Sequence, residues 1–443
     1  MRVFYLVFWA LLSSLTAVAQ SYSGRAEWQF SKDAENANVK HFITTGFYPA
    51  AVGEVDAALS FWRKGKLVGQ GALNDKGYPT AEAAKGDYWL FEVPVAEARK
   101  GLVADFYLPF MSNEGVRNNF VLEYRDGGRW RKAVDCRSTS AHKHPERLWQ
   151  AVCLEKKISK GDKLQLRLRR VEKGTVEATI ASPSARGQYP HIVLYDAVAQ
   201  RDTLRMLFLG NSYTYYYNYP MIFKEIAWHE GHYADCNIFI SGGYTMKAHL
   251  NNPHSCEKVD MGGYDCVMLQ DQSVLPMLNG TADDASSAEY LEQMVKRVKK
   301  SSPSAKVFVE ITWGRRFGNN NLGQYEKYAD KYPAFFKNYD AMQCRLIETI
   351  TAEAQQCGIG LHPLGYAWQI VMHERPDILL YHTDNHHQSY AGSYLSAAVA
   401  YLTIYGEKFG PNPANCKLEA DIAAYLRSVA ERVVLGGEKW CEK

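Results

Sequence analysis

The chain has 443 residues and a formal net charge of +3, from 51 Lys and Arg against 48 Asp and Glu. Hydrophobic residues make up 47% and charged residues 22%, which is ordinary for a globular protein and excludes a disordered or collagen-like chain. The balanced charge, without a long basic run, gives no support to a nucleic-acid partner. At about 150 residues per domain, the length predicts two or three domains.

The first residues have the pattern of an export signal. Arg2 is followed by an apolar run from Val3 to Leu12 and then by Ala17-Val18-Ala19, an A-x-A cleavage pattern. The run is shorter than the stretch of about 20 residues that crosses a membrane. We therefore expect a signal peptide over residues 1–19, a periplasmic or extracellular mature protein, and no stable insertion in a membrane.

Export permits disulfides, and the chain has nine cysteines. Cys136 and Cys153 flank one connection and are a plausible pair, and Cys416 with Cys441 could staple the C-terminal region. Buried thiols are the alternative for either pair. The spacings contain no C-x-x-C and match no zinc pattern.

Residues 20–202 mostly follow the period-two pattern of β-strands. Leu164–Arg169 alternates apolar with polar or charged residues, as a half-buried strand does. Asn119–Tyr124 is a second strand, and Asp126-Gly127-Gly128 then forms a turn. Further strands are expected at 88–93, 102–108 and 175–180. Many short strands with Gly and Asp turns predict an all-β antiparallel sandwich domain.

Residues 203–443 have a different pattern, in which strands alternate with helices. An apolar strand at Leu204–Leu209 comes first, and later strands are expected at 236–240, 264–269 and 306–313. Helices are expected around 220–230, 288–300 and 335–356. This alternation predicts a parallel sheet covered on both faces, with a ligand site outside the carboxyl ends of the strands.

Three residues in this second half have the chemistry of a catalytic triad. Ser212 follows the first strand in Gly-Asn-Ser, and Asp384 and His387 lie three apart, just before a helix that Ser389 can cap. His387 could accept the Ser212 proton while Asp384 orients the imidazole. The alternatives are an N-cap serine, a polar surface loop, or a metal site built from His382, Asp384, His386 and His387.

An acyl-transfer site also needs donors for the charge that develops on the carbonyl oxygen. The segment after the second strand contains Gly242 and Gly243, whose backbone N–H groups can approach a substrate closely. The segment after the third strand is Gln270-Asp271-Gln272-Ser273, which offers side-chain amides. The backbone N–H of Ser212 is a third kind of donor. Trp313, after the fourth strand, could form an aromatic platform or pack in the core.

The order of these motifs resembles the SGNH (GDSL-like) hydrolase superfamily over about residues 204–410. The resemblance implies a three-layer α/β/α domain in which Ser212 is the nucleophile, His387 the base and Asp384 the orienting acid. It assigns the oxyanion hole to Ser212, Gly243 and Gln272. The chain departs from the family pattern at Asn211, where Asp is usual, and at Gln272, where Asn is usual. Gly242 and Gln270 remain open as alternatives for the hole.

The resemblance extends to bacterial exported esterases that act on carbohydrate. It implies a serine esterase that removes ester groups, with O-acetyl favoured, from a small-molecule or glycan substrate through an acyl-enzyme. This chemistry needs no metal or organic cofactor. Two alternatives remain, a lipase- or thioesterase-like hydrolase with the same triad and a non-catalytic carbohydrate-binding protein on the same fold.

Overall fold

The computed structural model divides the chain into two compact units, residues 1–197 and 198–443, which are described separately. The described residues are 25–28, 35–45, 47–49, 52–53, 56–73, 79–95, 99–110, 120–136, 146–179, 191–195, 202–319, 322–411 and 413–440. The predicted signal peptide at residues 1–19 lies outside them. Among the described residues, none of the helices combines the length and the apolar character that crossing a membrane requires.

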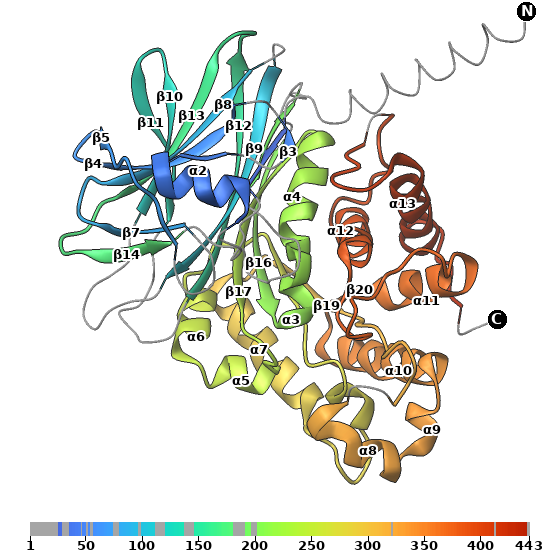
Figure 1. The fold of residues 1–443 in the computed structure, drawn as a ribbon. Coiled ribbons are helices and arrows are strands. Elements are labelled where there is room, and N and C mark those ends of the chain that lie inside the picture. Colours follow the sequence, from blue (N-terminus) through green and yellow to red (C-terminus); the bar gives the residue numbers. More distant parts are fainter. Residues whose placement is uncertain are drawn as a thin grey trace, which may run out of the picture. The chain divides into compact units, whose positions relative to one another are not determined.

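The first unit is built from antiparallel strands (Figure 1). One sheet has the order β12-β9-β15-β1-β3, a second has β11-β10-β13-β8-β4-β2 with β5 beside β4, and a third has β14-β7-β6. The strands are β1 (Arg25–Glu27), β2 (Phe47–Pro49), β3 (Val52–Gly53), β4 (Ala58–Arg63), β5 (Lys66–Leu67), β6 (Ala72–Leu73), β7 (Pro79–Ala83), β8 (Tyr88–Pro94), β9 (Arg99–Phe110), β10 (Phe120–Asp126), β11 (Arg129–Cys136), β12 (Glu146–Ile158), β13 (Lys163–Arg170), β14 (Val176–Thr179) and β15 (His191–Tyr195).

The predicted strands of this unit are present, but the unit is not made of strands alone. In β13 exposed or half-buried residues alternate with buried ones, as the sequence pattern indicates. The expectation of an all-β unit is wrong at α2 (Ala37–Thr45), a helix that buries Val39 and Phe42. The Phe42 ring packs against Tyr48 and Trp89, so this helix covers part of the core.

The second unit contains one parallel sheet of five strands in the order β17-β16-β18-β19-β20. The strands are β16 (Asp202–Gly210), β17 (His232–Ile240), β18 (Cys266–Leu269), β19 (Lys306–Glu310) and β20 (Gly360–His362). In chain order the arrangement is 2-1-3-4-5. The second strand, β17, lies on one side of β16, and the later strands β18, β19 and β20 lie on the other, so the order switches between β16 and β18. Ligand sites of such sheets lie at this switch point, beyond the carboxyl ends of the strands.

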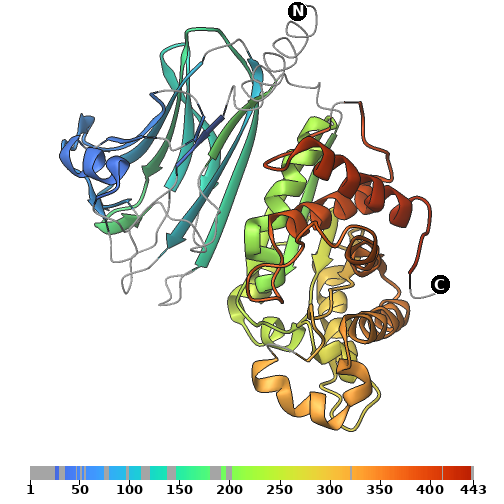
Figure 2. The same ribbon diagram turned by 45° about the vertical axis from the view of Figure 1, so that its right-hand side comes forward.

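Helices cover both faces of the sheet, which gives an α/β/α architecture (Figures 1 and 2). On one face α4 packs on α12 and α12 packs on α13, whereas α7 packs against α5, α6 and α10. The helices are α3 (Ser212–Tyr215), α4 (Tyr219–His229), α5 (Met246–Leu250), α6 (Pro253–Asp260), α7 (Ser287–Ser301), α8 (Glu326–Lys331), α9 (Pro333–Phe336), α10 (Tyr339–Cys357), α11 (Leu364–Glu374), α12 (Tyr390–Tyr405) and α13 (Ala420–Val434).

The cysteines differ from one expectation. Cys416 carries a thiol in the structure, so its predicted disulfide with Cys441 is wrong. Cys344, which the sequence pattern did not single out, takes part in a disulfide. The side chains of Cys136 and Cys153 lie outside the described part of the structure, and their pairing stays a prediction.

Candidate active site

The site begins where β16 ends and the short helix α3 starts. Gly210 is required there, because a Cβ at this position would collide with Thr214 Oγ1 and Gln270 Oε1. Asn211 is the N-cap of α3, and its side-chain oxygen accepts a hydrogen bond from the backbone N–H of Tyr213 at 3.1 Å. Ser212 is therefore held at the first position of a capped helix, at the carboxyl edge of the sheet.

Asn211, which stands where the family usually has Asp, also ties the segments after three strands together. Its amide Nδ2 donates to the carbonyl oxygens of Tyr244, at 2.8 Å, and Asp271, at 3.3 Å. Its backbone N–H donates to Gln270 Oε1 at 2.9 Å. An Asp could not donate from its ionised side chain, so these two bonds depend on the amide. The change to Asn therefore has a structural role here.

A buried histidine supports the same strand end. His249, in α5, is fully buried, with Nε2 3.0 Å from the carbonyl oxygen of Gly210 and Nδ1 2.9 Å from Ser255 Oγ. Burial lowers the pKa of His249 to about 4, against the opposing effect of the Gly210 carbonyl. The ring is therefore neutral at pH 7, and its two hydrogen bonds hold the end of β16 that precedes Ser212.

The structure brings the three predicted triad residues together. Ser212 Oγ lies 2.8 Å from His387 Nε2, and His387 Nδ1 lies 2.8 Å from Asp384 Oδ2. Asp384 and His387 come from a tight loop before α12, in which Asn385 has a φ of 59°. Asn tolerates this left-handed conformation better than most residues do. Ser389 caps α12 as predicted, since its Oγ accepts from the N–H of Gly392 at 3.1 Å.

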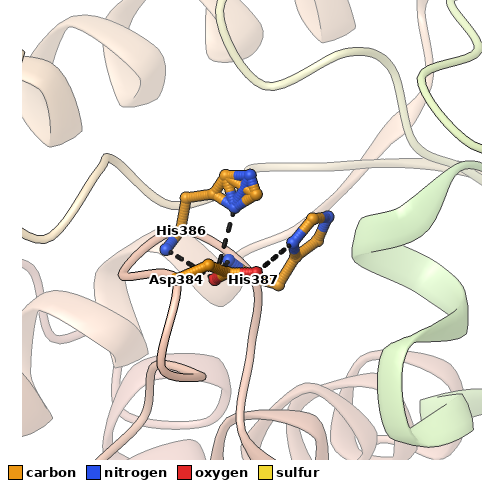
Figure 3. A group of neighbouring side chains, drawn as sticks. All are labelled: Asp384, His386 and His387. Carbon is orange, nitrogen blue, oxygen red and sulfur yellow. Dashed lines mark hydrogen bonds and ion pairs between the residues drawn. The ribbon is translucent and has the colours of Figure 1, made fainter. Parts of the chain in front are cut away.

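The loop holds Asp384 as an ionised carboxylate. Its Oδ1 accepts the backbone N–H groups of His386 and His387, at 3.1 and 3.0 Å, and its Oδ2 faces the His387 ring (Figure 3). Burial raises the pKa of Asp384, but the hydrogen bonds from the His387 side chain and from the two N–H groups outweigh it. The pKa lies well below its ordinary range. Because an ionised carboxylate only accepts, His387 Nδ1 carries the proton and Nε2 is left to accept from Ser212.

Aromatic rings fix the plane of the His387 imidazole. Tyr216 stacks on it face to face, with ring centroids 3.8 Å apart and 2° between the planes. Tyr213 meets the same ring edge-on at 5.6 Å. An electron-rich face next to the imidazole favours its cationic form, which is the form that develops when it takes a proton.

Trp313 lies in a buried stack below the loop and is not a surface platform. It is 1% exposed and stacks between Tyr213 at 4.3 Å and Trp368 at 4.2 Å, nearly parallel to both. Its Nε1 donates to the carbonyl oxygen of His386 at 2.9 Å. Of the two expectations for Trp313, core packing is the one the structure supports.

Gln388 joins the serine turn to the acid–base loop. Its fully buried amide Nε2 donates to the carbonyl oxygens of Tyr213, at 2.5 Å, and Tyr216, at 3.0 Å. Ser393 Oγ also donates to the Tyr216 carbonyl, at 2.9 Å. These bonds connect the last turn of α3 to the start of α12, and so fix the distance between Ser212 and His387.

The candidate oxyanion donors lie on two further loops. Gly243 has a φ of 72°, which favours glycine, and Gly242 lies beside the Tyr215 hydroxyl. The side-chain oxygen of Gln270 accepts from Asn211 N–H and Thr214 Oγ1, both at 2.9 Å, and its amide bonds to the Asp271 carbonyl. Gln270 is therefore occupied in holding the serine turn.

Gln272 is the other amide candidate on this loop. Its Oε1 accepts from the N–H groups of Val274 and Leu275, at 2.6 and 3.0 Å, and its Nε2 lies 3.5 Å from Ser273 Oγ.

The His-rich loop also has the composition of a metal site. Single ligand atoms of Asp384, His386 and His387 lie within 4.8 Å of one another. His382 Nδ1 is 3.7 Å from Asp384 Oδ2. The Asp384 oxygens already accept three hydrogen bonds from this loop, so an ion bound there would compete with the bond that orients His387.

Sequence reasoning missed several residues that build the site. Gln388 follows His387 directly, so its position in the motif was a usable signal. The sequence gives no such signal for His249 and Tyr216, because a lone histidine or tyrosine in a helical pattern predicts a core residue. The role of Asn211 appears only when the loops after β17 and β18 are brought to the end of β16.

No family model and no curated protein sequence matches the chain. Among solved structures, a Bacteroides uniformis protein of the DUF4886 family is similar at 16% identity and a TM-score of 0.45, over 54% of this chain and 97% of that one. A family two carbohydrate esterase from Clostridium thermocellum is similar at 13% identity and a TM-score of 0.32, over 76% and 97%. A peptidoglycan O-acetylesterase is similar at 10% identity and a TM-score of 0.31, over 79% and 76%. The similar structures thus include esterases. The function proposed below rests on the geometry of the site.

Proposed function

We propose that the chain is a serine esterase that removes O-acetyl groups from carbohydrate through Ser212, His387 and Asp384. The observation that carries the proposal is the continuous pair of 2.8 Å contacts from Ser212 Oγ to His387 Nε2 and from His387 Nδ1 to Asp384 Oδ2. A serine hydroxyl is a weak nucleophile unless a base takes its proton, and here the base and its orienting group are both in reach.

In the acylation step, Ser212 Oγ attacks the ester carbonyl carbon while its proton moves to His387 Nε2. The ionised Asp384 stabilises the imidazolium through Nδ1. The negative charge on the carbonyl oxygen is met by the backbone N–H groups of Ser212 and Gly243, with the Gln272 amide as the third donor. The tetrahedral intermediate then breaks its bond to the sugar oxygen, which takes the proton from Nε2 and leaves as an alcohol.

In the deacylation step, water attacks the acetyl group on Ser212. His387 takes a proton from that water and returns it to Ser212 Oγ as the acyl-enzyme bond breaks. The products are the regenerated hydroxyl and acetic acid, which ionises to acetate by releasing its proton to water. Each proton moves between groups of this chain, the substrate and water, so the scheme balances without a cofactor.

The proposal includes export and a glycan-positioning role for the first unit. The signal pattern at residues 1–19 supports the first part. The second is supported by a row of half-buried aromatic rings: Trp62 and Tyr88 are parallel at 6.1 Å, and Arg167 lies over both Tyr88 and Trp130. Aromatic faces are suited to stacking on sugar rings. Trp62→Ala and Trp130→Ala should weaken retention on immobilised glycan, whereas retention equal to wild type would remove this role.

The test of the esterase is hydrolysis of an aryl acetate by wild type, Ser212→Ala and His387→Ala. We expect turnover by wild type and a loss of at least about a thousandfold in kcat in each variant, the size typical of triad removal. Ser428→Ala, which removes an exposed hydroxyl on α13, is the matched control and should retain most of the activity. An inactive wild type, or an unimpaired Ser212→Ala, would reject the serine-esterase assignment in favour of a binding protein.

A further inference from the structure

Two arginines beside the triad have no carboxylate partner in the described part of the chain. Arg315 and Arg316 follow β19, at the sheet edge that carries Ser212. Arg315 is only 5% exposed, its Nη1 donates to the Tyr213 hydroxyl at 2.9 Å, and its Nε is buried without an acceptor. Arg316 is half-buried, and its Nη1 lies 3.4 Å from Asn385 Oδ1.

This arrangement differs from that of other arginines in the same unit. Several of those form close contacts with carboxylates, at 2.5 to 2.9 Å: Arg297 with Asp260, Arg345 with Glu348, Arg375 with Asp377, and Arg432 with Glu374 and Glu438. Even buried Arg427, which has no carboxylate contact among the described residues, donates to three oxygens. Arg315 is more buried than these, and yet its guanidinium donates to no acceptor in the described residues except the neutral Tyr213 hydroxyl. A buried cation without an anion lowers the stability of the fold, because the protein interior does not solvate the charge as well as water does.

Both arginines are tied to the catalytic residues. Tyr213 directly follows Ser212, its hydroxyl accepts from the Arg315 guanidinium at 2.9 Å, and its ring meets the His387 imidazole edge-on. The backbone N–H of Arg316 donates to the carbonyl oxygen of Asn385 at 3.1 Å, within the loop that holds Asp384 and His387. The oxygens of Asp384 accept from His387 and from two N–H groups of its own loop, and neither arginine makes a close contact with a carboxylate in the described part of the chain.

We infer that the esterase acts on an acidic saccharide, and that a carboxylate on the substrate's sugar, as in a uronic acid, pairs with Arg316 and Arg315. This inference rests on the proposed function. The guanidinium fork matches a carboxylate in two-point geometry, and a substrate anion would supply the partner that the described chain does not.

The test compares two esters that differ only in this charge, an O-acetylated methyl glucuronoside and the matching O-acetylated methyl glucoside. Wild type should show a kcat/KM at least about tenfold higher for the acidic ester, the worth of one charge-assisted pair. The ratio of the two kcat/KM values should fall about tenfold in Arg316→Gln and in Arg315→Met, and Arg315→Lys should restore part of it. Arg297→Gln, at the far end of α7, is the matched control and should keep the wild-type ratio.

The outcomes separate the two proposals. Equal kcat/KM for both esters in wild type would overturn the acidic-substrate inference and leave the esterase standing, and this comparison does not depend on whether an arginine variant folds. An unchanged ratio in folded Arg316→Gln and Arg315→Met would also overturn it. Failure of wild type on the aryl acetate as well would reject the esterase, and this inference with it.

Discussion

Two carboxylates near the site, Asp384 and Asp271, each accept two backbone N–H groups and yet differ in pKa. Asp384 has a side chain that is 23% exposed and also faces the His387 ring, and its pKa is held well below the ordinary range. Asp271 is 7% exposed and, within the described ranges, accepts only from Met246 N–H at 3.0 Å and Gln272 N–H at 2.6 Å. Burial raises the pKa of Asp271 to about 6, against the effect of those two bonds.

The difference shows that two amide donors do not offset full burial of a carboxylate, whereas two amides with an imidazole offset partial burial. Asp384 can therefore orient His387 as an anion across the working pH range. Asp271 instead joins the loops after β17 and β18, and it becomes protonated at mildly acidic pH. Variants at the two positions should consequently fail in different ways.

The largest effect is expected from Asp384→Asn. The amide can present its NH₂ to His387 Nδ1 and so favour the tautomer that cannot accept the Ser212 proton. We expect kcat to fall by about 10³- to 10⁴-fold, the size seen when a triad acid is replaced by its amide. Thermal unfolding of the variant provides the control for folding. A folded Asp384→Asn within about tenfold of wild type would contradict the role of Asp384.

A smaller effect on the activity that depends on His387 and Asp384 is expected from a change at Tyr216. Loss of the stacked ring in Tyr216→Leu should lower kcat by about tenfold and move the acidic limb of the kcat/KM–pH profile to lower pH, because the imidazolium loses a cation–π partner worth about 1 kcal/mol. Tyr216→Phe keeps the ring and should retain the wild-type profile. A profile that does not move in Tyr216→Leu would show that the ring is only packing.

Asp271→Asn should affect the pH dependence of stability more than it affects catalysis. The folded pKa of about 6 lies above the unfolded value of about 3.9, so the folded state holds more protons between these values, and stability falls as the pH rises through this window. The variant should flatten this fall in urea midpoints measured from pH 4 to pH 7. An unchanged slope would show that Asp271 is charged throughout.

Glu353 should give the smallest effect, on stability alone. It is buried in α10 and accepts from Ser287 Oγ at 2.5 Å and from the Asn279 amide. Burial raises its pKa to about 7. Because the folded pKa exceeds the unfolded one, stability should decrease as the pH rises from about 4 to 7, and Glu353→Gln should reduce this decrease without changing kcat. If the Tm of Glu353→Gln depends on pH in the same way as that of wild type, Glu353 does not titrate in this range.

The sequence predicted much of the framework because its patterns are local. The alternation in Leu164–Arg169, the apolar strand before Gly210 and the capping Ser389 each depend on neighbouring residues and were found correctly. The helix α2 was missed because its apolar residues cover a core that is assembled from distant strands. The triad side chains were identified because Gly-Asn-Ser and Asp-x-x-His are themselves short motifs.

The residues that align the triad could not be found in this way. Gln270, Gln388 and His249 act through contacts across 39 to 175 positions of sequence. Each looks like an ordinary polar residue until the sheet order 2-1-3-4-5 brings the strand ends together. Arg315 had no sequence signal either, since its lack of a carboxylate partner is a property of the folded surroundings.

The most direct test of the account is to treat the protein with an aryl phosphate triester, which phosphorylates activated serines with loss of the aryl alcohol, and to locate the adduct by intact and peptide mass spectrometry. The account predicts one phosphoryl group per chain on Ser212, absent in Ser212→Ala and strongly slowed in His387→Ala. No adduct, or an adduct on another residue, would contradict Ser212 as the nucleophile.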